Sequence, residues 1–132
     1  MAICKSGYFD QGYRTLLIIC NPRRDANSSR GTRVSQFTES VDIIPTILDW
    51  SGSDTPRQCE GFSLMRFCRG NPPAPADWQT EVHWEFDYWS VDGLEIEKVL
   101  GTSMDQCTLN VILSDKYKYV HFNGLPPLFF DL

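Results

Sequence analysis

The stretch from Val41 to Gly52, VDIIPTILDWSG, contains every signal needed for one helix. Apolar residues recur in it at the i, i+3, i+4 spacing of a single helical face, and these are Ile44, Ile47 and Leu48. Asp42 can cap the free N–H groups, and Pro45 falls in the first turn, where a missing N–H is harmless. Gly52 can supply the left-handed exit. The sequence therefore predicts a helix over 41–51.

Upstream of this helix, the run Thr15–Cys20 (TLLIIC) is apolar without polar alternation. This pattern is typical of a strand covered on both faces in the middle of an α/β sheet. The polar segment Asn21–Gly31 predicts a loop, and Thr32–Phe37 predicts a second short strand. Residues 1–70 are thus expected to form an α/β piece.

Downstream of the helix, the sequence pattern changes after the proline-rich segment 71–77, which we interpret as a connector. Three segments then have the composition of strands: Glu81–Trp89, Leu109–Leu113 and Tyr117–Phe122. Residues 114–116 suit a hairpin turn between the last two. The expected fold is mixed α/β (α+β), in which residues 78–132 form a small antiparallel β subdomain.

Composition excludes several function classes. The chain has 132 residues, a net charge of −5 and a pI near 4.9, so it lacks the basic face that nucleic-acid binding requires. No apolar run approaches the length of about 18 residues that a membrane span needs. Five cysteines without a CxxC pair indicate reduced thiols, and with no apolar leader segment this predicts a cytoplasmic protein.

One group of side chains could bind a metal ion. His83, Glu85 and Asp87 alternate along a predicted strand, so they project from one face. Imidazole and carboxylate groups are ligands that some divalent metals accept. The alternative, which we favour, is the wet face of a half-buried strand, because period-2 alternation is the default strand pattern.

Lys5 is the other candidate. It lies in a glycine- and tyrosine-rich loop just before the apolar run, and loops at strand ends often line the site of an α/β sheet. A lysine there could hold an oxyanion, although a lone lysine near an N-terminus is more often a solvated side chain. No GxSxG, P-loop or GxGxxG motif occurs.

Four segments, taken in order, resemble the sulfatase branch of the alkaline-phosphatase-like superfamily. The segment Thr38–Gly52 resembles a family helix that reads D-x-x-P-T-L-L-D-x-x-G, and Cys59–Leu64 (CEGFSL) resembles the D-G-x-S-L turn that follows it. Lys116–Val120 (KYKYV) resembles the R-x-K-Y-I strand, and Leu128–Leu132 (LFFDL) the E-L-Y-D-L ending. The bacterial phosphonate monoester hydrolase and arylsulfatase group is the most similar, and the resemblance covers almost the whole chain.

The resemblance implies a divalent-metal hydrolase of phosphate, phosphonate or sulfate esters. Its nucleophile would be a formylglycine made from a C/S-x-P-x-R motif, and its metal ligands would include a D-H-G motif. D-H-G does not occur in the 132 residues, and their one C-x-P-x-R pattern, Cys20–Arg24 (CNPRR), lies downstream of Lys5, whereas the resemblance places the family's nucleophile and metal ligands upstream of it. Only Lys5 carries over, at the place of the family's lysine that reaches the charged oxygens of the substrate, with Cys4 in place of the usual glycine.

We therefore expect the C-terminal portion of such an enzyme, without ester hydrolysis of its own. The run Thr15–Cys20 would then present an apolar strand edge, which predicts a homo-oligomer formed by edge pairing, or pairing with the missing N-terminal part. Two alternatives remain: an oligomeric binding module on this fold, and a small metal-binding protein that uses His83, Glu85 and Asp87.

Overall fold

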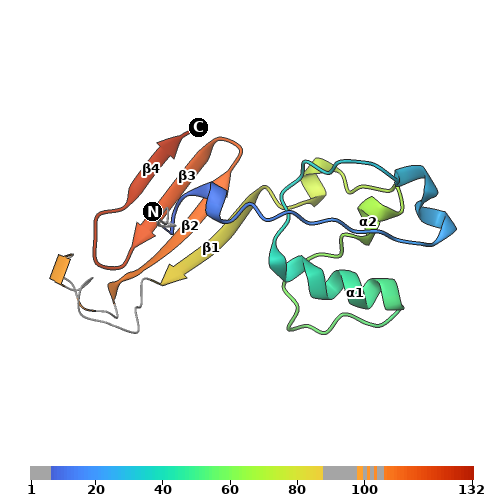
Figure 1. Cartoon of the computed structure of the whole chain (residues 1–132), viewed down its shortest axis with the longest axis horizontal. Coiled ribbons are helices and arrows are strands. Elements are labelled where there is room, and N and C mark those ends of the chain that lie inside the picture. Colours follow the sequence, from blue (N-terminus) through green and yellow to red (C-terminus); the bar gives the residue numbers. More distant parts are fainter. Residues whose placement is uncertain (1–6, 88–97, 100, 102, 104–105) are drawn as a thin grey trace, which may run out of the picture. The chain divides into compact units, whose positions relative to one another are not determined.

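The computed structural model describes residues 7–87, 98–99, 101, 103 and 106–132, and these fall into two compact units (Figure 1). Unit 1 combines residues 7–16 with the segment that begins at Glu81 and ends at Leu132. Unit 2 is Leu17–Thr80. The segment 1–70 that the sequence suggested as one piece is thus shared between both units, and the segment 71–77 lies in unit 2.

Unit 1 is built on a four-stranded antiparallel sheet in the order β1-β2-β3-β4. The strands are β1 (Glu81–Asp87), β2 (Thr108–Ser114), β3 (Tyr117–Phe122) and β4 (Leu128–Asp131). The structure confirms the mixed α/β class, the three predicted strands and the hairpin turn between β2 and β3. Residues 88–89 of the predicted first strand lie outside the described residues, and β4 was not anticipated.

The core of unit 1 follows from strict alternation along these strands. Leu109, Val111 and Val120 are fully buried on one face of the sheet. Four larger side chains pack against them: Tyr8, Trp84, Phe86 and Phe122. Because neighbouring residues of a strand point to opposite faces, the same strands leave a polar and aromatic second face exposed.

Unit 2 contains little regular structure apart from its helices. Helix α1 (Ile43–Ser51) follows the 3-10 turn Ser40–Asp42, and the short α2 is Met65–Cys68. The predicted helix is confirmed, with Pro45 in its first turn and Gly52 at a left-handed φ of 78° just after its end. Asp42 does not cap α1, however, so that prediction was wrong. Its carboxylate makes the contacts described below.

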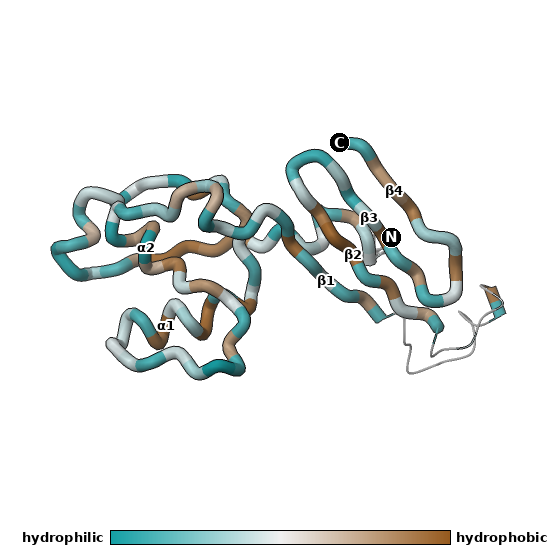
Figure 2. The backbone as a smooth tube through the Cα atoms, turned by 180° about the vertical axis from the view of Figure 1, so that it is seen from behind, coloured by the Kyte–Doolittle hydropathy of each residue, from teal (hydrophilic) through white to brown (hydrophobic). Residues whose placement is uncertain are grey.

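The predicted strands at Thr15–Cys20 and Thr32–Phe37 are also wrong, because neither segment pairs with a strand among the described residues. A strand exists only if a neighbour accepts and donates its backbone hydrogen bonds, and among the described residues no strand does so for the first segment. Its apolar side chains are left open, with Leu16 87% and Ile18 78% exposed. Figure 2 colours this run as continuously hydrophobic.

Of the helices that the structure describes, none has the length and apolarity required to cross a membrane.

The exposed apolar run generates a prediction about association. Purified chain should form dimers or larger species at high concentration in sedimentation experiments, because exposed apolar surface of this kind favours self-association. Ile18→Lys should shift the distribution toward monomer. Leu132→Lys, at another exposed apolar position (64% exposed), should leave it unchanged. A wild-type chain that stays monomeric at high concentration would contradict the prediction.

Candidate functional site

The exposed face of β1 carries the three side chains proposed as metal ligands. His83, Glu85 and Asp87 all lie on the exposed side of the strand, as the alternation predicted. His83 Nε2 lies 3.4 Å from Glu81 Oε1, so its neighbour is a residue of the same strand outside the proposed set. Among the described residues, no group of three or more His, Cys, Asp or Glu side chains is arranged to hold a metal ion.

Lys5 and Cys4 lie outside the described residues, but the segment that follows them is fixed to the sheet of unit 1. Trp84 Nε1 donates a hydrogen bond to the Gly7 carbonyl at 2.8 Å. A Cβ at Gly7 would lie 2.7 Å from the Phe86 ring, so only glycine fits there without displacement. Tyr13 stacks on Trp84 with ring centroids 5.0 Å apart, and burial raises the pKa of its hydroxyl.

A buried lysine completes this attachment. Lys118, from the segment resembling the family's R-x-K-Y-I strand, is only 7% exposed and pairs with Asp10 at 2.5 Å. Its Nζ also lies within 5.8 Å of the ring centroids of Tyr8, Trp84 and Phe130. A buried ammonium is stable only when paired, and both the carboxylate and the ring faces attract it. Lys118 therefore joins the sheet to the segment that follows Lys5, and its charge is neutralised within the protein.

In unit 2, the residues that carry the family resemblance form a second polar site, on one face of α1. Asp42 is completely buried. Its Oδ1 accepts a hydrogen bond from the Phe62 backbone at 2.7 Å, and its Oδ2 accepts one from the Glu39 backbone at 2.8 Å. Gln79 Nε2 approaches the same Oδ2 at 3.4 Å. One carboxylate thus connects three separate parts of unit 2.

Thr46 and Asp49 continue this face at i+4 and i+7. The Thr46 hydroxyl donates to the Asp42 carbonyl at 2.6 Å and accepts from the Leu64 backbone at 2.8 Å. Asp49 accepts a hydrogen bond from Ser63 at 2.6 Å through one oxygen and an ion pair from Arg69 at 2.8 Å through the other. The helix is thereby held to the turn that precedes α2 by polar contacts.

The turn Cys59–Leu64 (CEGFSL) passes so close to the start of α1 that it needs a glycine at Gly61. A Cβ at Gly61 would lie 2.3 Å from the Val41 carbonyl oxygen, a distance that no side chain tolerates against backbone. Glycine is therefore required for the turn to approach the start of α1 closely enough for the Phe62 N–H to donate its hydrogen bond to Asp42.

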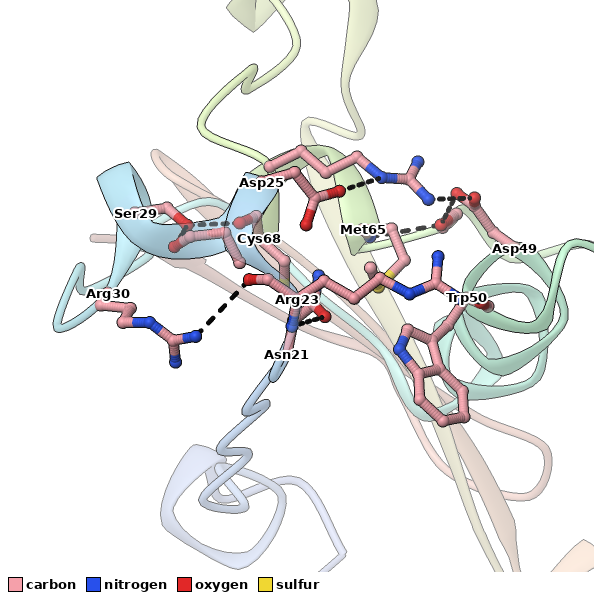
Figure 3. A network of polar contacts seen from close by, with 12 residues as sticks. Asn21, Arg23, Asp25, Ser29, Arg30, Asp49, Trp50, Met65 and Cys68 are labelled. Atoms are coloured by element: carbon pink, nitrogen blue, oxygen red, sulfur yellow. Dashed lines mark hydrogen bonds and ion pairs between the residues drawn. The ribbon is translucent and has the colours of Figure 1, made fainter.

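Figure 3 shows the outer part of this network, around Asp49. Arg69 also approaches Asp25 at 4.0 Å, which joins α2 to the 3-10 helix Arg24–Ser29. Ser29 Oγ bonds the Cys68 carbonyl nearby. Asn21 Oδ1 accepts from the Arg23 backbone at 3.1 Å, whereas its buried Nδ2 has no hydrogen-bond partner.

The pKa shifts in this network favour a structural role for its residues over a catalytic one. The Ser63 hydrogen bond, with help from Arg69, holds the pKa of Asp49 below its ordinary value against the opposing effect of partial burial. Burial raises the pKa of the Cys68 thiol, although the charge of Arg69 opposes this, so the thiol is held in its less nucleophilic form. None of the described cysteines is in a disulfide.

The role of Thr46 can be tested by removing its hydroxyl. Thr46→Val keeps the shape of the side chain but leaves the buried Leu64 N–H without an acceptor, so we expect a loss of about 1–3 kcal/mol in the free energy of unfolding. Urea unfolding followed by tryptophan fluorescence measures it. Thr55→Val in an exposed loop is the matched control and should stay within about 0.5 kcal/mol of wild type. Equal effects of the two substitutions would contradict the assignment.

The lowered pKa of Asp49 predicts how stability depends on pH. The folded pKa lies below the unfolded value, so the stabilisation is fully present above the ordinary carboxyl range and is lost as pH falls through the folded pKa. Asp49→Asn should therefore flatten the decline in stability below about pH 4, measured as the urea midpoint at successive pH values. Asp54→Asn, in an exposed loop, should leave the wild-type decline in place. An unchanged decline in Asp49→Asn would show that other groups cause it.

No protein-family model matches the chain, but individual relatives do. The chain is 45% identical over 130 residues to the multifunctional alkaline phosphatase superfamily protein PehA of Trinickia caryophylli; the match covers 97% of this chain and 24% of that protein. An N-acetylglucosamine-6-O-sulfatase of Bacteroides thetaiotaomicron is 29% identical over 86 residues, which are 61% of this chain and 15% of the sulfatase.

Solved structures give the same result. The phosphonate monoester hydrolase of Agrobacterium radiobacter matches 78% of this chain with 37% identity and a TM-score of 0.67, over 20% of its own length. The corresponding hydrolase of Silicibacter pomeroyi matches 74% with 32% identity and a TM-score of 0.63, over 19% of its length. The chain thus spans about a quarter or less of these relatives. It belongs to the alkaline phosphatase superfamily, in the group that includes phosphonate monoester hydrolases and sulfatases, and corresponds to a portion of those longer proteins.

Proposed function

We propose that this chain is the C-terminal portion of a phosphonate monoester hydrolase or sulfatase and that it supplies the oxyanion-binding Lys5 without hydrolysing esters by itself. One observation carries the proposal. The match to the relative from Trinickia covers nearly the whole chain but only 24% of that protein. The 132 residues contain no D-H-G, and their one C-x-P-x-R pattern, Cys20–Arg24, follows Lys5 instead of lying upstream of it as the resemblance requires.

The chemistry of ester hydrolysis supports the same division. Attack on phosphorus or sulfur needs an activated oxygen nucleophile, and a divalent cation stabilises the charge that develops on the transferring group. The described residues do not fit such a cation, because their His, Cys, Asp and Glu side chains form no group of three suited to it. We therefore derive no catalytic step through a metal on these residues.

The attachment of the segment after Lys5 supports a role for this lysine. A group that stabilises developing charge must be held in place before the reaction, since reorientation during the reaction costs activation energy. Gly7, Asp10 and Tyr13 each contact the sheet of unit 1. These contacts fix the chain two residues after Lys5 to a sheet whose core is fully buried.

The first test is an assay of the chain alone. Chromogenic phosphonate monoester, phosphate diester and aryl sulfate substrates, each with added divalent metal, should be hydrolysed at the background rate. Any signal should be compared with that of Lys5→Ala. Turnover that rises in proportion to the chain and falls in Lys5→Ala would overturn the proposed inactivity.

A second experiment tests the role of Lys5 in a single fused polypeptide. In this fusion, the chain replaces the matched 130 residues of the Trinickia relative. Lys5→Ala in this fusion should lower kcat/KM about 10²–10³-fold, the usual effect of removing one oxyanion donor. Lys116→Ala, at an exposed lysine in the turn between β2 and β3, should change it little. Equal activity of the Lys5→Ala and wild-type fusions would exclude the role assigned to Lys5.

A further inference from the structure

Lys118 lies in an enclosure formed by two parts of the chain that are far apart in the sequence. The sheet of unit 1 contributes the rings of Trp84 and Phe130. The N-terminal segment, residues 7–14, contributes the Tyr8 ring and the Asp10 carboxylate. The Lys118 ammonium lies 5.6–5.8 Å from the three ring centroids and 2.5 Å from Asp10 Oδ1. The enclosure is therefore complete only while this segment lies on the sheet.

The sheet alone does not account for a lysine at position 118. Alternation along β3 places Lys118 on the same face as the buried Val120, and its partner across the sheet is the buried Leu113. An apolar side chain would fill such a position without the desolvation cost of an ammonium, and a buried ion pair seldom adds net stability over an apolar replacement. What the lysine adds is a charge that selects one carboxylate, Asp10, at one position.

Asp10 is placed so that its position determines the shape of the segment. It begins a 3-10 helix of three residues, and its carbonyl accepts hydrogen bonds from the backbone N–H groups of Tyr13 and Arg14, both at 2.9 Å. The Lys118 pair therefore anchors the middle of the segment, between its two contacts with Trp84. A hydrogen bond between ionised groups is short and directional, so it fixes position more narrowly than ring stacking does.

We propose that Lys118 is a positioning residue of the oxyanion site: by pairing with Asp10 it sets the position of the N-terminal segment and, through the chain, that of Lys5. This rests on the proposed function of Lys5. Lys118 makes no contact with substrate in this role, because it is only 7% exposed and its charge is already matched by Asp10. Its effect on the reaction is indirect, since a displacement of about 1 Å in a group that acts on the substrate can cost about 10²-fold in rate.

The first measurement is backbone hydrogen exchange of the full 132-residue chain. In Lys118→Met, the amides of Tyr13 and Arg14 should exchange about tenfold faster than in wild type, because the turn that protects them loses its ion pair with the sheet. Lys118→Arg keeps the charge and should restore most of the protection. Lys116→Met removes an exposed lysine of the adjacent turn and is the matched control, with no change expected. Slow exchange in β2 and β3 shows in each variant that the sheet is folded.

The second measurement is the steady-state kinetics of the fused polypeptide, in which the chain replaces the matched residues of the Trinickia relative. Lys118→Met should lower kcat/KM about tenfold through misplacement of Lys5, and Lys118→Arg should recover most of the loss. Because Lys118 acts through Lys5, the effect of Lys118→Met should be absent when Lys5→Ala is already present. A merely structural lysine would lower kcat/KM by the same factor in both backgrounds.

The two measurements separate this proposal from the one on which it rests. Unchanged exchange in Lys118→Met would overturn the positioning role, and so would a loss of kcat/KM that persists alongside Lys5→Ala. Faster exchange with unchanged kcat/KM would also overturn it, provided that Lys5→Ala impairs the fusion. A Lys5→Ala fusion with wild-type activity counts instead against the proposed function, and the exchange rates then decide whether Lys118 holds the segment. If Lys118→Met does not fold, Asp10→Asn removes the same ion pair from the other side and takes its place.

Discussion

The buried carboxylate of Asp42 is the contact on which unit 2 depends. It accepts hydrogen bonds from Glu39 and Phe62 and is approached by Gln79, so it fixes the entry to α1, the turn before α2 and the end of the unit at once. A buried carboxylate is costly unless its oxygens are satisfied, and here backbone N–H groups do most of this work. The fit of Gly61 against Val41 is a consequence, because the turn must come close enough to donate.

The two units are stabilised in different ways. Unit 1 depends on apolar alternation across a sheet, with Val120 at its centre and the Lys118–Asp10 pair attaching the N-terminal segment. Unit 2 depends on hydrogen bonds and ion pairs around one face of a helix, with few apolar side chains inside. In keeping with this contrast, the residues of unit 2 that carry the family resemblance make structural contacts. None of them is assigned as a nucleophile.

The sequence predicted the elements whose signal is local. Strands β1 to β3 were found because each alternates with period 2, and α1 because its spacing, Pro45 and Gly52 agree. Strand β4 was missed because its residues Leu128–Asp131 are all exposed and show no alternation. Thr15–Cys20 was predicted as a strand because its composition reflects burial, yet pairing requires a neighbour that the described chain does not contain.

The candidate site was less predictable than the fold. The exposure of His83, Glu85 and Asp87 followed from alternation, whereas the tertiary contacts of Asp42 and Lys118 bridge 20 and 108 residues and left no local signal. An acidic residue before a helix is usually a cap, and this default was applied to Asp42. The i, i+4, i+7 spacing of Asp42, Thr46 and Asp49 is the one pattern from which a polar inner face could have been inferred.

The polar and apolar faces of α1 can be altered independently in protein engineering. Because the contacts that fold unit 2 lie on the polar face of this helix, the isoleucines on the other face can be exchanged without touching them. Replacing these isoleucines with charged helix-forming residues gives a route to a soluble stand-alone version of the unit. In most domains the apolar face of a helix is part of the core, so the same substitutions would remove core side chains.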